Sequence, residues 1–247
     1  RLFIQSIEQG GSLIYYDDDL ALHSLAAEAN GRKIPYSVHP FELDKNQTIV
    51  TDSVGTNYPL AIFGKHNLAN LNAAYYVCKE MGVDETTFYN AISSFKGASR
   101  RLELVASNGK SFIYRDFAHA PSKVMASTAA LRVQHQNDQL IVCLELHTFS
   151  SLNEAFIDQY ADSLNDADIA IVFYDPHAVA LKRLPKMSFD RIKTAFNRKD
   201  LMVFSDKENL VSYIIEHYDG SAAIAFMSSG SFNGLNLTEF ASNLQIN

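Results

Sequence analysis

The sequence predicts an α/β protein whose carboxyl-terminal part is a doubly wound domain built on a mostly parallel sheet. Five short apolar runs each suit a strand that is buried on both faces; they span residues 112–114, 140–144, 169–174, 201–204 and 222–227. Segments with helical spacing of apolar residues lie between these runs, at 121–135, 154–165, 188–197 and 206–217. This alternation is typical of a parallel sheet with helices on both faces.

The residues before this series predict shorter and more varied elements. Gly10 and Gly31 each follow a segment of helical spacing, at the position where glycine commonly ends a helix. Asp84 precedes another such segment and is a suitable N-cap. The predicted helices cover residues 1–9, 20–29, 71–81 and 85–95, and the predicted strands cover 12–16, 34–38, 48–51 and 58–62.

The character of the sequence changes near Gly97, where we place a boundary between two domains, 1–97 and 98–247. Two short strand-like segments then flank Asn108-Gly109, the residue pair preferred in tight hairpin turns. In the alternating series that follows, Pro121 suits the first turn of its helix. Ser205 and Glu208 have the spacing of a capping box for the last helix of the series.

The composition is that of an ordinary globular protein, with 247 residues, 47% hydrophobic and 20% charged. The net charge is −7 and lysine and arginine form no long run, so we expect no nucleic-acid partner, which would need clustered cations. No apolar stretch approaches the roughly 20 residues of a membrane span, and no signal peptide is recognisable. We therefore expect no membrane partner and a cytoplasmic location.

The two cysteines, Cys78 and Cys143, lie in a helical segment and an apolar run. The sequence contains no C-x-x-C pair, so the cysteines do not predict a zinc site. We expect buried free thiols in a reducing compartment, and we assign no metal-binding residue.

Polar side chains follow the apolar runs, and ligands of parallel sheets bind beyond the carboxyl ends of the strands. An acidic residue with a histidine two or three positions later follows three separate runs, which indicates a binding site. Solvated loops also place polar residues at strand ends, so position alone leaves both interpretations open. The residues are Asp116 and His119, Glu145 and His147, Asp175 and His177, and the final Ser228-Ser229-Gly230.

The sharpest local signal is the segment GKHNLAN at residues 64–70. Glycine lets the backbone turn tightly after a strand, and Asn67 and Asn70 are spaced to share one face of a helix start. An amide side chain has both a donor and an acceptor, which suits the edge of a purine. Alternatively, Asn67 caps the helix and Asn70 is simply exposed.

Two further segments have groups that suit phosphate, ribose or carboxylate. Arg100 and Arg101 carry guanidinium groups that bind such anions well, although a pair flanking a hairpin can be ordinary surface. Asp116 ends a strand, where a carboxylate can accept hydrogen bonds from ribose hydroxyls. His119 lies at a helix start, which favours anions. Alternatively, Asp116 only terminates the strand and His119 only covers the helix end.

Hydroxyl-rich turns follow two later runs. His147 and the hydroxyls after it could hold a polar small molecule, or Ser151 or Asn153 could simply cap the next helix. Ser228 and Ser229 begin a turn of small residues whose backbone N–H groups could form an anion nest.

Two motifs of other nucleotide-binding classes are excluded. Residues 109–111 end like a P-loop, but Leu104 stands where that motif requires glycine. The G-x-G-x-x-G of dinucleotide-dependent oxidoreductases is not found after any strand-like run.

Taken together and in order, five segments resemble the Mur ligase family. GKHNLAN is similar to its G-x-H-N-x-x-N pattern, and DFAHAP resembles its D-[YF]-[AG]-H-x-P segment. FKGASRRLE is similar to the segment that closes the central domain of these enzymes and opens the C-terminal one. The other two segments are ELHTFSSLN and MSSGSFNG. The resemblance covers essentially the whole chain.

The resemblance implies an ATP-dependent ligase of peptidoglycan synthesis or murein recycling, with three domains. This chain would contain the last part of the central ATP-binding α/β domain at 1–97 and the Rossmann-like C-terminal domain at 98–247. Family members phosphorylate a substrate carboxylate to an acyl phosphate, which an incoming amine attacks to form an amide. The implied partners are UDP-N-acetylmuramate and either L-alanine or a tripeptide, with ATP and Mg²⁺ as cofactors.

Matching positions imply roles in nucleotide binding. Asn67 and Asn70 would contact adenine, with His66 supporting that turn. Arg101 would reach the phosphates and Asp116 the ribose.

Matching positions also imply contacts with the second substrate. His119 would lie where the nucleotide and the incoming substrate meet, and His147, Ser228 and Ser229 are candidates for holding the amine. The nearest relatives carry a second histidine at the position of Ala120, which leaves the substrate contacts there open.

The family's P-loop, magnesium-binding glutamate and carbamylated lysine are expected upstream of Arg1. We therefore assign no catalytic residue in this chain and expect it to be inactive by itself. The alternative is a stand-alone nucleotide-binding module without catalysis.

Overall fold

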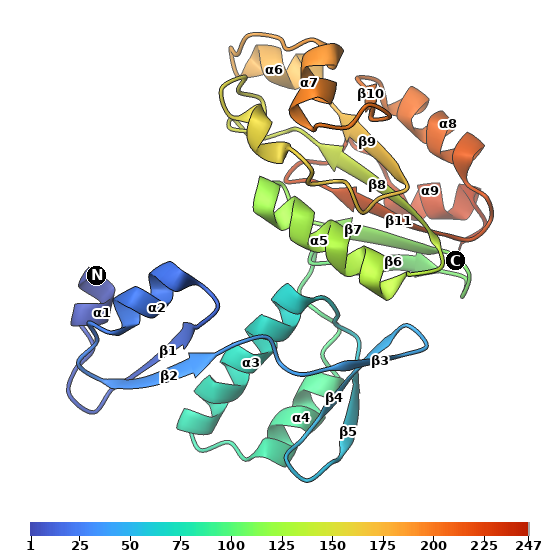
Figure 1. Cartoon of the computed structure of the whole chain (residues 1–247). Coiled ribbons are helices and arrows are strands. Elements are labelled where there is room, and N and C mark those ends of the chain that lie inside the picture. Colours follow the sequence, from blue (N-terminus) through green and yellow to red (C-terminus); the bar gives the residue numbers. More distant parts are fainter. Residues whose placement is uncertain (247) are drawn as a thin grey trace. The chain divides into compact units, whose positions relative to one another are not determined.

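The computed structural model describes residues 1–246, and the chain divides into two compact units, Arg1–Lys96 and Gly97–Asn247 (Figure 1). The first unit contains a parallel strand pair and a three-stranded antiparallel sheet. Its elements are α1 (Leu2–Gln5), β1 (Ser12–Tyr16), α2 (Leu20–Ala26), β2 (Arg32–Tyr36), β3 (Glu42–Asp44), β4 (Gln47–Thr51), β5 (Asn57–Leu60), α3 (Lys65–Glu80) and α4 (Glu85–Ser93).

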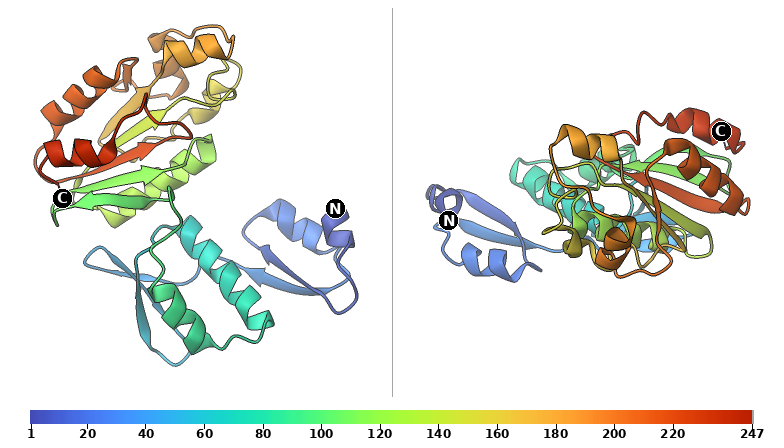
Figure 2. Two further views of the ribbon diagram at one scale, coloured as in Figure 1. Left: turned by 180° about the vertical axis from the view of Figure 1, so that it is seen from behind. Right: turned by 90° about the horizontal axis from the view of Figure 1, so that it is seen from above.

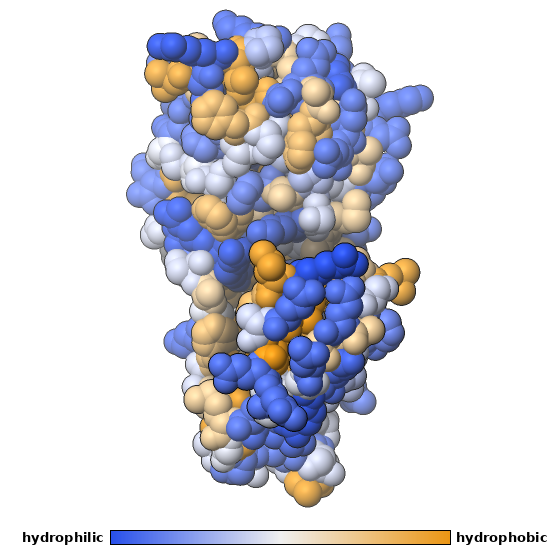
Figure 3. All heavy atoms as spheres, turned by 90° about the vertical axis from the view of Figure 1, so that its left-hand side faces the viewer, coloured by the Kyte–Doolittle hydropathy of each residue, from blue (hydrophilic) through white to orange (hydrophobic). Residues whose placement is uncertain are grey.

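Helix α3 of the first unit packs with α4 against the antiparallel sheet. It begins directly after Gly64, whose φ of 88° is strained for any residue with a side chain. The shared core consists of Val50, Tyr58, Leu60, Leu68, Leu71, Phe88 and Tyr89. By contrast, Leu2, Phe3 and Leu20 of the first two helices are exposed. Figure 3, viewed from the left-hand side of Figure 1, shows hydrophobic residues on the surface.

The second unit is a six-stranded sheet in the order β10-β9-β8-β11-β7-β6. All neighbouring pairs are parallel except β6 with β7, which form the hairpin. The prediction of a doubly wound α/β fold with a mostly parallel sheet is confirmed. The elements are β6 (Glu103–Ser107), β7 (Phe112–Asp116), α5 (Pro121–Gln134), β8 (Gln139–Glu145), the 3-10 turn η1 (Ile157–Tyr160), β9 (Ile169–Phe173), α6 (Pro176–Leu181), α7 (Phe189–Ala195), β10 (Met202–Phe204), α8 (Lys207–His217), β11 (Ala222–Met227) and α9 (Leu237–Asn243).

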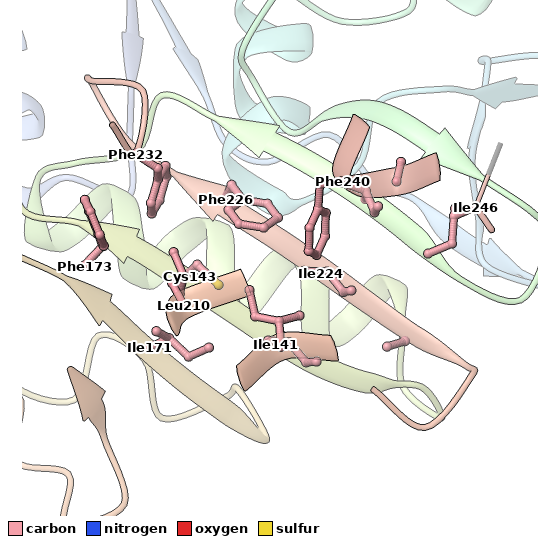
Figure 4. Packing of buried hydrophobic residues seen from close by; sticks show 14 residues of the cluster. Ile141, Cys143, Ile171, Phe173, Leu210, Ile224, Phe226, Phe232, Phe240 and Ile246 are labelled. Carbon is pink, nitrogen blue, oxygen red and sulfur yellow. The ribbon is translucent and has the colours of Figure 1, made fainter. Parts of the chain in front are cut away.

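Helices cover both faces of this sheet. Helix α5 lies on one face and α8 and α9 on the other (Figures 1 and 2). From β8 the chain moves to the edge strand β10, and it then returns through α8 to β11. Because crossovers are right-handed, connections that move across the sheet in opposite directions place their helices on opposite faces. Strand β11 is thereby inserted between β8 and β7. Its apolar side chains pack under α8 and α9 in the core drawn in Figure 4, with Ile224 and Phe226 at most 1% exposed.

The predicted helix at 154–165 is wrong. The structure has consecutive turns there, with a single 3-10 turn at Ile157–Tyr160. Leu152, Ile157 and Leu164 are nevertheless buried, so the apolar spacing reflects burial without helical hydrogen bonding. Asp162 has a φ of 62°, which a continuous right-handed helix cannot contain.

The predicted capping box is also wrong. Helix α8 is capped by Asp206, whose carboxylate accepts from Asn209 N at 2.9 Å, so the cap lies one residue after Ser205. In the first unit, α1 and α2 end before Gly10 and Gly31. Gly31 serves a close approach instead, because a Cβ there would lie 2.4 Å from the Gly11 carbonyl oxygen.

Three short elements were not predicted: β3, α6 and α9. The helix predicted at 71–81 begins six residues earlier, at Lys65, and the one predicted at 1–9 ends at Gln5. Most other boundaries differ by one to three residues.

Candidate functional site at the carboxyl edge of the sheet

Four neighbouring strands of the second unit end in polar residues that the sequence singled out. The strand order places Asp175, Glu145, Ser228 and Asp116 in a row. Glu145 and Asp116 are the last residues of their strands, Ser228 directly follows β11, and Asp175 is the second residue after β9. Ser228 joins two members of this row, because its backbone N–H donates to the Asp116 carbonyl at 2.9 Å and its hydroxyl donates to the Glu145 carboxylate. The insertion of β11 between β8 and β7 therefore creates the site.

Asp116 holds the connection from β7 to α5. Its side chain is only 4% exposed, its Oδ2 accepts from Ser127 Oγ at 2.5 Å, and its Oδ1 accepts from Ala118 N at 3.2 Å. A carboxylate has roughly four lone-pair sites, so Asp116 can still accept from a ligand in the cavity that it lines. Its contact with ribose remains a prediction.

Arg101, Phe117 and His119 form a stack beside Asp116. The Arg101 guanidinium carbon lies 5.7 Å from the Phe117 ring centroid, and the rings of Phe117 and His119 meet edge to face at 5.1 Å. His119 Nδ1 lies 2.8 Å from the Phe117 carbonyl, to which it can only donate, so neutral His119 presents a lone pair at Nε2. Within residues 1–246 Arg101 has no acidic partner, which leaves its guanidinium available for an anion.

Glu145 collects hydrogen bonds from the turn after β11. Its side chain is almost completely buried, and its Oε2 accepts from Ser228 Oγ and from Phe232 N, the latter at 2.9 Å. Ser228 Oγ in turn accepts from Gly230 N at 2.6 Å. Because burial of a carboxylate is costly unless it is hydrogen-bonded, this network holds the turn at 228–232 against β8.

His147 faces the other oxygen of the same carboxylate. Its Nδ1 lies 3.6 Å from Glu145 Oε1, and its side chain is 39% exposed. Ser229 lies on the adjoining turn, and its Oγ is buried without a hydrogen-bond partner in the structure. The structure thus brings His147 and Ser228 together at Glu145, with Ser229 next in the chain to Ser228. Asp175 instead accepts from His177 N at 2.8 Å and caps α6.

A cavity of about 200 Å³ opens beside this row, on the face of the sheet that α9 covers. Two arginines are among the residues that line it, Arg100 and Arg115. Arg115 forms an ion pair with Glu103 at 3.0 Å. The backbone N–H of Arg100 and the Arg115 guanidinium both stabilise the charged carboxylate, which lowers the pKa of Glu103. The other lining residues are Val105, Asp116, Phe226, Ser228, Gly230, Ser231, Phe232, Leu235, Asn236, Leu237 and Thr238.

In the first unit, the predicted adenine-contacting residues lie in the first turns of α3. Asn67 does not cap the helix, since Gly64 occupies that position without a side-chain bond. Asn67 Nδ2 instead donates to the Phe63 carbonyl at 2.9 Å, which leaves its Oδ1 as an acceptor. Asn70 is exposed, and His66 is half-buried beside them.

Sequence reasoning missed Ser127 as a site residue. Ser127 lies on the buried face of α5 with Val124 and Leu131, so its signal was a polar residue at an apolar helical position. Gly230 was among the residues predicted at the strand ends, but its close approach to Glu145 and His147 is a property of the folded chain that the sequence does not display.

No cluster of three or more His, Cys, Asp or Glu side chains that could hold a metal ion occurs within residues 1–246. In the same part of the chain, none of the helices combines the length and the apolar character needed to cross a membrane. Both cysteines are free, with Cys143 buried and Cys78 half-buried.

Comparison with known proteins bears on the family and the fold of the chain. Residues 100–230 match the family described as Mur ligase, glutamate ligase domain. The UDP-N-acetylmuramate–L-alanine ligase of Caldicellulosiruptor bescii is 26% identical over 252 residues, which covers 94% of this chain and 54% of that protein. The chain thus spans about half the length of this relative.

Solved structures share the fold. A murein peptide ligase from Psychrobacter arcticus superposes with a TM-score of 0.63 at 22% identity, covering 98% of this chain and 52% of the other. The UDP-N-acetylmuramate–alanine ligase of Thermotoga maritima gives a TM-score of 0.66 at 16% identity, covering 94% of this chain and 51% of the other.

Proposed function

Because the chain belongs to the Mur ligase family, we propose that it is the part of an ATP-dependent ligase that brings the incoming amine to UDP-N-acetylmuramate. The reaction forms an amide through an acyl phosphate, in peptidoglycan synthesis or murein recycling, and belongs in the cytoplasm, where ATP is available. In this proposal residues 1–97 are the end of the central ATP-binding domain, and residues 98–247 are the C-terminal domain.

The observation that carries the proposal is the row of polar groups at the carboxyl ends of β8, β11 and β7. Ligands bind at this edge in doubly wound sheets, next to the point where the strand order reverses. Here a buried carboxylate, two hydroxyls and an accessible imidazole come from two neighbouring strands. Such a set suits a small polar substrate with an ammonium group.

On the nucleotide side, the groups of each unit suit parts of ATP. Asn70 is exposed and its amide makes no hydrogen bond within residues 1–246, so it can pair with a purine edge. Arg101 has no acidic partner within residues 1–246, and its guanidinium, which contacts the Phe117 ring, suits a phosphate. We assign adenine to Asn67 and Asn70 with the support of His66, the phosphates to Arg101 and the ribose to Asp116.

The second substrate is assigned to His119, His147, Ser228 and Ser229. His119 presents its Nε2 at the start of α5, and the Ser229 hydroxyl is a buried group in need of a partner. A ligand that supplies that partner removes the cost of an unsatisfied hydroxyl, about 1–3 kcal/mol. L-Alanine and a tripeptide both carry the ammonium and carboxylate groups that this set could bind.

ATP supplies the phosphoryl group that activates the carboxylate, and Mg²⁺ typically binds through phosphates and only one or two carboxylates. The residues of this chain orient the two substrates and exclude water. They include no P-loop, so we expect the purified chain to show no ATP turnover. Robust magnesium-dependent ATPase activity of the chain would contradict this expectation.

Nucleotide binding can be tested on the chain itself by calorimetric titration with ADP. Arg101→Ala should weaken binding by about tenfold, because it removes a charge-assisted hydrogen bond. Arg183→Ala, which removes an exposed arginine of the α6 end, should leave binding unchanged. Equal affinity of both variants and the wild type would refute the assignment of Arg101.

The ligase activity is tested by assaying a complete ligase containing this chain with UDP-N-acetylmuramate and ATP. Separate reactions receive L-alanine or tripeptide, and formation of an amide product with either one supports the proposal. Nucleotide binding without product from either amine would instead favour a nucleotide-binding module that lacks catalysis.

A further inference from the structure

Burying the Glu145 carboxylate costs free energy, and packing of the hydrophobic core does not require a carboxylate at this position. It ends β8 among side chains that are apolar and inaccessible, and its Oε2 takes two donors, the hydroxyl of Ser228 and the backbone N–H of Phe232. Its Oε1 lies 3.6 Å from Nδ1 of His147, which is longer than a hydrogen bond but close enough for the carboxylate to attract an N–H at that position electrostatically. The two oxygens therefore have separate tasks: one holds the turn after β11, and the other faces an accessible imidazole.

Gly230 provides an independent sign that this arrangement is built for close contact. A Cβ at this position would lie 2.7 Å from Glu145 Oε2 and 2.8 Å from both Cγ and Nδ1 of His147. These distances are shorter than van der Waals contact, so only glycine lets the turn approach both side chains. Carboxylate, imidazole and turn are thus held together from two strands.

We propose that Glu145 is the positioning residue of the amine site: it sets the ring orientation and the tautomer of His147 while it anchors the turn that carries Ser228 and Ser229. The role toward an amine substrate rests on the proposed ligase function, but the effect on His147 does not. A carboxylate is an acceptor only, so it favours the neutral imidazole with its proton on Nδ1. Nε2 is then left with a lone pair, which can accept a hydrogen bond from an incoming ammonium.

Replacing Glu145 with glutamine makes a specific spectroscopic prediction. The glutamine carbonyl must take the place of Oε2, because Ser228 and Phe232 both donate there. Its NH₂ group then takes the place of Oε1 and donates toward His147 Nδ1. A donor at that place favours a lone pair on Nδ1, so the proton of the neutral ring should move to Nε2.

The test is a long-range ¹H–¹⁵N correlation spectrum of the complete 247-residue chain at about pH 8, where an ordinary histidine is neutral. The His147 signals are assigned by their loss in His147→Gln. We expect the Nδ1–H tautomer in the wild type and the Nε2–H tautomer in Glu145→Gln. The control Glu154→Gln makes the same chemical change at an exposed site and should keep the Nδ1–H tautomer.

The same tautomer in the wild type and in Glu145→Gln would overturn the proposal. If Glu145→Gln does not fold, the wild-type spectrum still decides, because an Nε2–H tautomer or an even mixture there contradicts the role of Glu145.

A second measurement separates positioning from a purely structural role. In a complete ligase containing this chain, Glu145→Gln should raise KM for the amine substrate on the order of tenfold or more, because a misplaced contact group is costly. The KM for ATP should stay unchanged. A tautomer change with no change in the amine KM would refute positioning, whereas no ligation by the wild type would refute the proposed function and leave the tautomer result standing.

Discussion

Gly230→Ala should destabilise the second unit by steric crowding, since glycine has no side chain whose hydrogen bonds could be lost. The new methyl group would lie 2.7 Å from Glu145 Oε2 and 2.8 Å from His147 Cγ and Nδ1. Glu145 cannot move away, because Ser228 and Phe232 hold it. Overpacking of this kind costs about 1–3 kcal/mol, which for a protein of this size lowers the melting temperature by roughly 2–4 °C per kcal/mol.

The assay is urea unfolding followed by circular dichroism, with Gly230→Ala compared with the wild type, His147→Ala and the double variant. Two of the three closest atoms belong to His147, so the double variant should lose less stability than the sum of the two single changes. We expect a coupling of at least about 0.5 kcal/mol, the size seen for residues in contact. An unchanged unfolding midpoint for Gly230→Ala, or strict additivity in the double variant, would refute the close approach at this turn.

Three further predictions concern other buried groups. Burial lowers the pKa of His135, so the unfolded chain binds more protons in acid and stability should fall as the pH drops below about 6.5. In His135→Gln, the urea concentration at the unfolding midpoint should therefore depend less on pH in this range. The same pH dependence in the variant and the wild type would contradict this prediction. Ser127→Ala should cost about 1.5–3 kcal/mol in urea unfolding, because it removes a hydrogen bond to the buried Asp116 carboxylate; a loss below about 0.5 kcal/mol would show that the bond is unimportant. Burial raises the pKa of the Cys143 thiol, so a disulfide reagent should react with Cys78 in the native chain and with Cys143 only after unfolding; rapid reaction of both native thiols would be the contrary result.

Strands buried on both faces were the most predictable part of the fold. Each of the five apolar runs became a strand. Four of them are central strands, which must be apolar on both sides in a parallel sheet, and the fifth, β10, is a short edge strand. The hairpin at Asn108-Gly109 was equally predictable, since Gly109 adopts a φ of 82° that suits few other residues. These features depend on local chemistry, which the sequence displays directly.

The segment at 154–165 shows where such reasoning fails. Apolar side chains recur there at helical spacing, yet only Ile157–Tyr160 forms a 3-10 turn. Leu152 and Leu164 are buried without a helix, and the 3-10 turn between them contacts α5 and α7, so tertiary contacts outweigh the local preference for helix. The spacing of apolar residues thus predicted which residues are buried, but it did not predict the hydrogen bonds that their backbone forms.

The sequence by itself determined the α/β class, the parallel sheet and the polar residues that end its strands. It also placed Asp116, Glu145, His147 and Ser228 among the candidates for a site. Only the tertiary structure decided which of them meet, because β11 is last in the sheet's sequence order and yet pairs between β8 and β7. That insertion sets the Ser228 hydroxyl on the Glu145 carboxylate, a contact between strands far apart in the chain that no local pattern encodes.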